Sequence, residues 1–179
     1  MTKLALGFTR VSPTHHRFEY RREDGSGEAI EMETRSLLTH DLLHYAVESE
    51  ADLKGSFYGI LDRIGGYEEL SVNGGAALGG EVAITERVVG ALTGALQDET
   101  LDADAFAEQV TEFLDIYDER APRWFTPAFV LAVRERMRQL LGRWKATPFG
   151  ETMTLQFPSP LAEEGSARSL SDEGSRRMR

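Results

Sequence analysis

The chain has no cysteine, and it has no long hydrophobic run. Without thiols, disulfide bonds, cysteine-ligated zinc, iron–sulfur clusters and thiol-based catalysis are all excluded. No stretch approaches the roughly 20 apolar residues of a membrane span, and the N-terminus lacks the apolar core of a signal peptide. We therefore expect a cytoplasmic protein without a membrane partner.

Basic residues are scarce compared with acidic ones. The 179 residues include 20 Lys and Arg against 30 Asp and Glu, and residues 36–120 alone hold four basic and eighteen acidic side chains. An acidic surface repels phosphate groups, so nucleic acid and anionic lipid are disfavoured as partners. With 41% hydrophobic and 28% charged residues, the chain has the composition of a soluble globular domain that can bury a core.

Alternating apolar and polar residues predict an antiparallel sheet. Three alternating runs lie near residues 3–10, 15–23 and 28–34, and the DGSG at 24–27 supplies a turn before the third run. A fourth run, TMTLQF at 152–157, is expected to join this sheet as an edge or inserted strand.

Helical periodicity predicts five helices between the third and fourth strands. The first four cover about 37–49, 55–64, 81–97 and 102–117. The fifth is the best marked, because Thr126 suits an N-cap and Pro127 suits the first helical position. The order of elements predicts one α+β domain over residues 1–157, a β-meander with a C-terminal strand packed against about five helices. Residues 158–179 are polar, rich in serine and glycine, and expected to be a disordered tail.

One predicted helix, with the sequence THDLLHYAVESE at 39–50, has a pattern that suits a metal ion. His40 and His44 are four residues apart, so both imidazoles can reach one zinc ion. Asp41 follows the first histidine, where the metalloprotease helix H-E-x-x-H has its longer glutamate. Glu48 lies about 12 Å along the axis from His40, and it could share an ion only with His44. His16, on the inward face of the sheet, is our candidate third ligand.

The same residues also fit an ordinary amphipathic helix. The helix is expected to be capped by Ser36 or Thr39. With Thr39 as N-cap, Asp41 would lie in the first turn, where a carboxylate favours the helix dipole. His44 and Glu48 would then be a common i,i+4 pair. The three histidines are thus hypothetical ligands, and the two acids are hypothetical bases or orienting groups. No cofactor is predicted, and zinc or another divalent metal is the alternative that this helix leaves open.

Two segments resemble stretches of a group of uncharacterised bacterial hypothetical proteins. They are LLTHDLLHYAVESEADLKGSFYG, which has the form L-x-H-D-L-x-H-x-x-x-E followed by a glycine–aromatic segment, and LGRWKATPFGETMTLQFP. Together they cover less than a third of the chain. The resemblance implies a shared small fold and brings no activity, cofactor or catalytic residue with it.

Two other segments could be interpreted as binding sites, but a structural role explains each of them better. VNGGAALGGE at 72–81 precedes a helix, but it matches neither phosphate-loop pattern and is typical of a linker. RERMRQLLGRWK at 134–145 could form an anion-binding patch, but it carries core residues and no interleaved aromatic residues. We expect its arginines to pair internally with the acidic helices of residues 81–119.

Two classes of function follow. The leading interpretation is a non-enzymatic binding or interaction module, whose acidic face meets a basic protein partner or a second copy of the chain. The alternative is a divalent-metal protein, including a metal-dependent hydrolase, that uses the HDLLH helix. The sequence does not decide whether the protein is an enzyme. The two classes are distinguished by whether His40 and His44 face a third nitrogen or oxygen ligand.

Overall fold

The computed structural model describes residues 4–63, 66, 67, 70, 79–95, 102–116 and 121–157. The predicted tail at 158–179 and most of the glycine-rich segment lie outside the described residues. The elements in chain order are β1 Leu4–Arg10, β2 His15–Arg21, β3 Gly27–Glu33, a π-helical turn Thr34–Leu38, α1 Thr39–Glu50, α2 Phe57–Arg63, α4 Gly80–Ala95, α5 Ala103–Ile116, α6 Pro127–Ala146 and β4 Thr152–Phe157. The predicted α+β class is confirmed.

The four strands form one antiparallel sheet in the order β3-β2-β1-β4. Strand β4 pairs with β1, with Leu155 opposite Leu6, so the last predicted strand is an edge strand. Alternation places one face of the sheet in the core, as expected for a half-buried sheet. The buried apolar residues of this face are Leu4, Leu6, Phe8, Phe18, Tyr20, Met32, Met153, Leu155 and Phe157.

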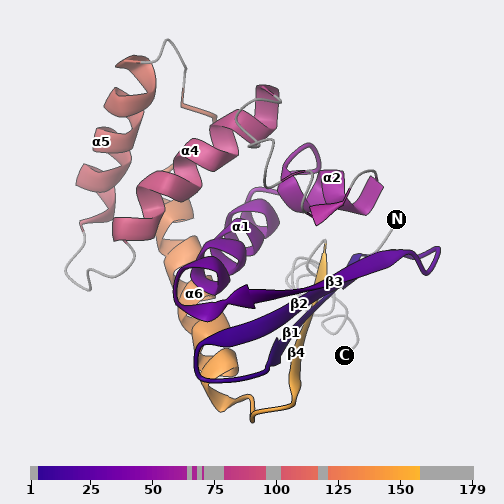
Figure 1. Cartoon of the computed structure of the whole chain (residues 1–179). Helices are drawn as coiled ribbons and strands as arrows, with labels where there is room; N and C mark the ends of the chain where they lie inside the picture. The colour runs from indigo at the N-terminus through magenta and orange to yellow at the C-terminus, as the bar shows by residue number, and fades with distance from the viewer. Residues whose placement is uncertain are drawn as a thin grey trace, which may run out of the picture.

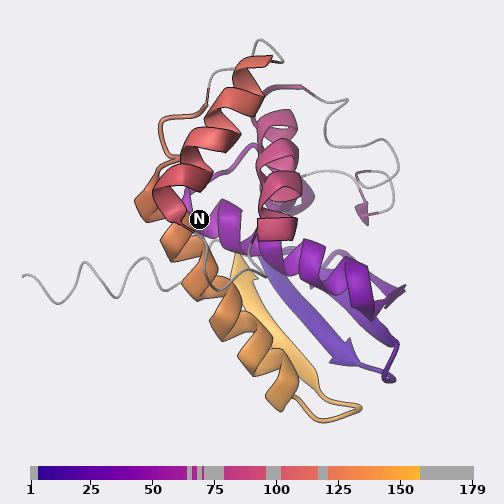
Figure 2. The same ribbon diagram turned by 90° about the vertical axis from the view of Figure 1, so that its left-hand side faces the viewer.

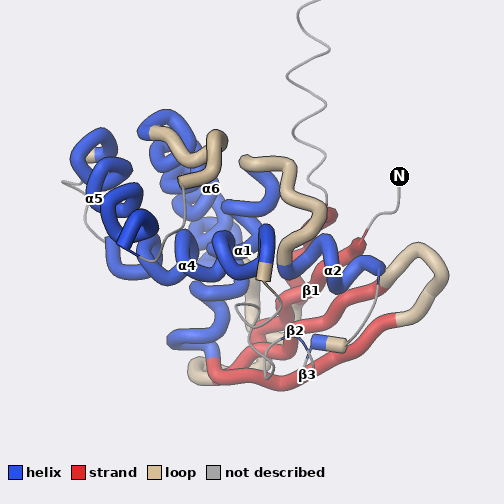
Figure 3. Tube along the Cα trace, turned by 90° about the horizontal axis from the view of Figure 1, so that it is seen from above, coloured by secondary structure: helices blue, strands red, loops and turns tan. Residues whose placement is uncertain are grey.

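Helices α1 and α6 cover the apolar face of the sheet (Figures 1 and 2). Tyr45 of α1 stacks edge-on against Phe157 of β4, and Trp144 of α6 lies edge-on to His16 of β2. Helix α4 packs on α1 and α5 packs on α6, so both lie farther from the sheet (Figure 3). Helix α1 is therefore buried between the sheet and α4.

The start of α1 differs from the prediction. The carboxylate of Glu33 accepts hydrogen bonds from the backbone N–H groups of Arg35 and Ser36, at 2.7 and 3.0 Å. The chain passes from β3 directly into a π-helical turn and then into α1. Ser36 and Thr39 are therefore not the N-cap, because helical backbone already begins at Thr34. At α6 the prediction is confirmed, since the Thr126 hydroxyl accepts from the N–H of Phe129.

The arginines of α6 have internal partners. Arg136 binds Glu50 of α1 at 2.6 Å, and Arg138 binds Glu135 one turn earlier in α6 at the same distance. Arg143 donates to the carbonyl of Thr154 in β4. These three partners lie in α1, α6 and β4. The residues 81–119, in which the sequence predicts partners, are only partly among the described residues, so that pairing stays a prediction. None of the described helices is long and apolar enough to cross a bilayer.

Arg10 joins β1 to the C-terminal end of α6. Its Nη1 donates to the carbonyls of Thr147 and Lys145, at 2.8 and 3.3 Å. Its guanidinium lies over the rings of Phe149 and Trp144, at 4.4 and 5.5 Å from the centroids. A cation at this end of a helix satisfies carbonyls that have no partner within the helix.

We expect the Arg10→Met substitution to lower the free energy of unfolding by about 1–2 kcal/mol, because the carbonyl hydrogen bonds and the cation–π contacts are lost together. Urea denaturation followed by circular dichroism measures the change. Arg17→Met on the neighbouring strand is the control, since Arg17 is exposed and its distance to Glu19 is 4.0 Å. A control change as large as the Arg10 change would contradict this role for Arg10.

Candidate metal centre

Two histidines of α1 and one glutamate of α4 converge between these helices. His40 and His44 are one turn apart, and their ring centroids are separated by 4.6 Å. Glu86 approaches from α4, with its Oε1 3.4 Å from Nε2 of His44. One ligand atom from each of the three residues lies within 4.8 Å of the others. Among the described residues, this is the single group of three or more metal-ligating side chains that are this close.

Glu86 reaches the histidines because of its place on α4. The buried stripe of this helix includes Val82, Val89 and Leu92, and Glu86 stands between the first two at helical spacing. Its side chain is 24% exposed, so the carboxylate lies at the rim of the contact between α4 and α1. A charged residue within an apolar stripe is the sequence signal that could have indicated a role for Glu86. The sequence does not show which helix Glu86 would face.

A buried carboxylate holds the other side of the His44 ring. Oε1 of Glu48 lies 3.2 Å from Nδ1 of His44, and Oε2 accepts a hydrogen bond from the backbone N–H of Tyr58 at 2.9 Å. Glu48 is fully buried, and burial raises its pKa despite these contacts. The i,i+4 pair predicted for His44 and Glu48 is present, but it lies in the core rather than on the surface.

His44 is therefore placed between two carboxylates. Burial disfavours the imidazolium form, but Glu48 and Glu86 outweigh burial and raise the pKa of His44 to about 9. In the same way, burial favours protonated Glu86, but His44 outweighs it and the pKa of Glu86 is lowered. Nε2 of His44 is buried and within ion-pair distance of Glu86, yet it has no aligned hydrogen-bond partner among the described residues.

A second carboxylate stands behind His40. Oδ1 of Asp41 lies 3.4 Å from Nδ1 of His40, and both oxygens of Asp41 accept from the hydroxyl of Tyr67, at 3.2 and 3.1 Å. Burial and the adjacent Asp41 raise the pKa of Tyr67, so it remains a donor. Asp41 is buried, whereas the His40 side chain is 45% exposed.

This arrangement has the chemistry of a metal site. Histidines that bind metals generally direct their second ring nitrogen to a carboxylate or carbonyl, which sets the ring orientation. Here Nδ1 of each histidine faces a buried carboxylate, and Nε2 of His44 faces Glu86. Two zinc ligands in tetrahedral geometry are about 3.3 Å apart, close to the observed 3.4 Å between His44 and Glu86. The remaining separations close with a shift of at most about 1.5 Å, which the half-exposed His40 can supply.

His16 does not belong to this group. It is fully buried on β2, where its ring stacks on Phe8 and meets the edge of Trp144, with centroid distances of 6.2 and 6.0 Å. Its Nδ1 lies 3.3 Å from the hydroxyl of Thr34, and burial lowers its pKa. His16 is thus a core histidine beneath α6. Glu86, and not His16, is the third side chain of the group that could hold a metal ion.

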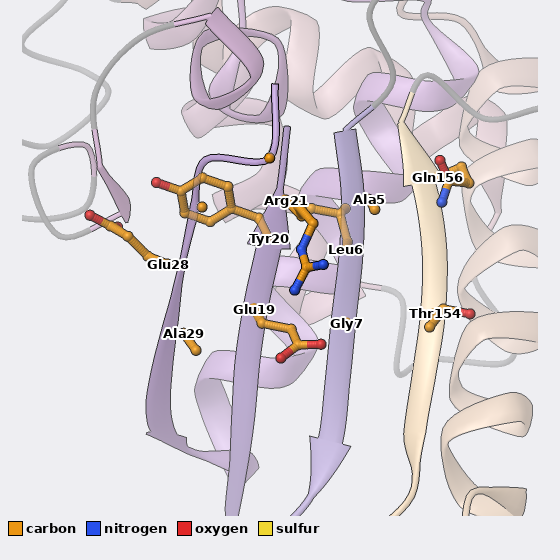
Figure 4. Close-up of a pocket in the computed structure, with 12 residues that line it drawn as sticks. Ala5, Leu6, Gly7, Glu19, Tyr20, Arg21, Glu28, Ala29, Thr154 and Gln156 are labelled. Carbon is orange, nitrogen blue, oxygen red and sulfur yellow. The ribbon is translucent and has the colours of Figure 1, made fainter. Parts of the chain in front are cut away.

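A separate hollow of about 520 Å³ lies on the outer face of the sheet (Figure 4). Glu19 lies across Gly7, where an added Cβ would be only 2.7 Å from the Glu19 Cγ. Arg21 and Glu28 also line the hollow, among small or neutral side chains. None of the residues in the hollow forms a metal-ligating group within the part of the chain that is described. The stronger candidate for a metal site is therefore the group of His40, His44 and Glu86 between α1 and α4.

No protein-family model, curated protein or solved structure matches the chain. The resemblance to bacterial hypothetical proteins accordingly stays a prediction.

Proposed function

We propose that the protein binds one divalent transition-metal ion, with zinc as the expected metal, through His40, His44 and Glu86. The observation that supports this most is the convergence of three ligand atoms within 4.8 Å. Two nitrogen donors and one carboxylate are a donor set that zinc accepts, and the same set also suits non-haem iron(II). Asp41 and Glu48 would orient the two rings from behind.

A metal-free ion-pair network would explain only part of the arrangement. Glu48 and Glu86 satisfy the charge of His44 without any ion. They give no reason for the second imidazole beside it, or for Asp41, a buried carboxylate held by the Tyr67 hydroxyl against the half-exposed His40 ring. A shared ion accounts for both histidines, since each ring would use one nitrogen for the metal and one for its carboxylate.

The geometry favours an orienting role for Asp41 over the role of a base. Its two oxygens are engaged by the Tyr67 hydroxyl and face His40, and its side chain is only 3% exposed. A general base has to reach the proton that it removes, directly or through one water. Hydrolysis at this centre therefore stays a prediction, and no residue is assigned as its base. The binding of a basic protein partner also stays a prediction.

We expect untagged wild-type protein to carry about one zinc ion per chain after incubation with zinc and desalting, as measured by elemental analysis. Glu86→Gln and His40→Ala are each expected to weaken zinc binding at least about 100-fold in competition with a chelator, because each removes one of three ligands. Both side chains are partly exposed, so these variants are expected to fold.

The matched controls are His15→Ala, an exposed histidine of β2, and Glu112→Gln, an exposed glutamate of α5. Both should bind zinc as the wild type does. The metal proposal is wrong if folded wild-type protein takes up no zinc, or if Glu86→Gln and His40→Ala bind zinc as tightly as the two controls.

A further inference from the structure

We infer that Glu81 is a positioning residue of the metal site, because its carboxylate ties the start of α4 to the end of α1 and so holds Glu86 beside the two histidines. The inference rests on the proposed metal site. It concerns a residue outside the group of three ligands, and it acts through the placement of Glu86.

The carboxylate of Glu81 joins α4 to the segment that follows α1. Oε1 of Glu81 accepts a hydrogen bond from the backbone N–H of Gly55, at 2.5 Å. A Cβ added to Gly55 would lie only 2.8 Å from the same oxygen, so the close approach depends on glycine. A hydrogen bond from an N–H to a carboxylate is short and directional, and it fixes the relative position of the two groups.

The donor is itself held in place by the end of α1, the helix that carries both histidines. The N–H of Leu53 donates to the carbonyl of Glu48 in the last turn of α1, at 2.9 Å, and the Leu53 side chain is buried. Arg63 of α2 donates to the carbonyl of Lys54, at 2.8 Å. The N–H of the next residue, Gly55, therefore has a defined position relative to α1.

The chain on the other side of Glu81 does not provide a similar restraint. Gly79 and Gly80 lead into α4, and both have a positive φ, of 70° and 61°. No atom of the described residues lies within 4 Å of a Cβ added to either glycine. The hydrogen bond between Glu81 and Gly55 is thus placed to fix the start of α4.

A displacement of Glu81 would reach Glu86 through the helix. The two residues are five positions apart, about 7.5 Å along the axis at 1.5 Å per residue. The buried stripe of Val82 and Val89 also holds α4, but apolar packing has no preferred direction. Metal binding requires ligand atoms within about 0.5 Å of their productive positions. A directional contact near Glu86 is therefore expected to affect zinc affinity.

The test measures zinc affinity of the full-length chain by competition with a chelator. We expect Glu81→Ala to weaken zinc binding about tenfold. Glu81→Gln keeps an oxygen acceptor for the Gly55 N–H and should remain within about threefold of the wild type. Gly55→Ala displaces the carboxylate from the other side and should also weaken binding about tenfold. The matched control is Gly90→Ala in α4, where no atom of the described residues lies within 4 Å of the added Cβ.

Cobalt(II) distinguishes positioning from a general effect on stability, because its visible spectrum reports the ligands of the bound ion. The spectrum of cobalt-loaded Glu81→Ala is expected to move toward that of Glu86→Gln, since both variants weaken the same carboxylate ligand. A residue that only stabilises the fold would leave the spectrum of the bound ion unchanged. Gly55→Ala provides the same comparison if Glu81→Ala does not fold.

Absence of zinc and cobalt uptake by folded wild-type protein would overturn both the metal proposal and this inference. Uptake by the wild type, with Glu81→Ala and Gly55→Ala equal to Gly90→Ala in zinc affinity, would leave the metal proposal standing and overturn the role of Glu81. The role of Glu81 would also be overturned by weaker binding without a change in the cobalt spectrum, or by a loss in Glu81→Gln as large as in Glu81→Ala.

Discussion

The Glu48→Ala substitution is expected to lower the free energy of unfolding of the metal-free protein by about 3–5 kcal/mol. Glu48 is fully buried, and it contacts the His44 ring at 3.2 Å and the backbone N–H of Tyr58 at 2.9 Å. Alanine leaves a buried imidazolium with one carboxylate instead of two, leaves a buried N–H without a partner, and creates a small cavity. Urea denaturation at pH 7, followed by circular dichroism and tryptophan fluorescence, measures the loss.

Two variants distinguish the loss of stability in Glu48→Ala from the loss that follows the removal of any other glutamate. Glu48→Gln keeps an oxygen acceptor in the same place and is expected to lose about 1–2 kcal/mol. Glu108→Ala, at an exposed position of α5, is expected to change stability by less than about 0.5 kcal/mol. If Glu48→Ala lost no more than Glu108→Ala, the buried pair of His44 and Glu48 would not contribute to stability as inferred.

The stability of the metal-free protein is expected to fall by about 3 kcal/mol between pH 6.5 and pH 9 because of His44. The flanking carboxylates raise the pKa of His44 from 6.5 to about 9 in the folded state, so the folded protein binds this proton more tightly than the unfolded chain does. The stabilising contribution is complete below pH 6.5, declines as the pH rises, and is lost above about pH 9.

Urea denaturation across this pH range, with chelator present, gives the dependence. The His44→Gln variant carries no titrating group at this position and should lose much less stability over the same range. The difference between the two curves isolates His44 from the other groups that titrate. Parallel curves for the two proteins would contradict a raised pKa for His44.

Bound zinc is expected to remove this dependence between pH 6.5 and pH 9, because neither the zinc-bound protein nor the unfolded chain then holds the His44 proton. His44 has to give up its proton before Nε2 can bind the ion, so zinc affinity should rise by up to about tenfold per pH unit below pH 9. Chelator competition at pH 7 and pH 8 measures this. A zinc affinity that does not change with pH would mean that the ion does not displace the proton of His44.

Much of the fold could be predicted from local patterns in the sequence. The alternation at residues 152–157 indicated a strand, and β4 pairs with β1 because its apolar residues match the inward face of the sheet. Thr126 and Pro127 marked the start of α6, because an N-cap and a proline at the first position act within one turn. The start of α1 could not be predicted in this way. Glu33 lies at the end of β3, and its capping role depends on the direction in which the strand enters the helix.

The candidate site shows the same division. The i,i+4 spacing of His40 and His44 follows from helix geometry alone, and so does the pairing of His44 with Glu48. His16 and Glu86 are the contrasting cases. Strand alternation correctly places His16 inward, but it does not specify which helix covers it, and α6 covers it with Trp144.

By itself, the sequence determined most of the secondary structure, the inward faces and two of the three proposed ligands, because these depend on residues within a few positions of one another. Only the tertiary structure decided that α4 packs on α1 and brings Glu86 to His44. It also decided that Glu48 and Asp41 are buried behind the two rings. Helix packing depends on side chains that are distant in the sequence, so no local pattern records which carboxylate completes the site.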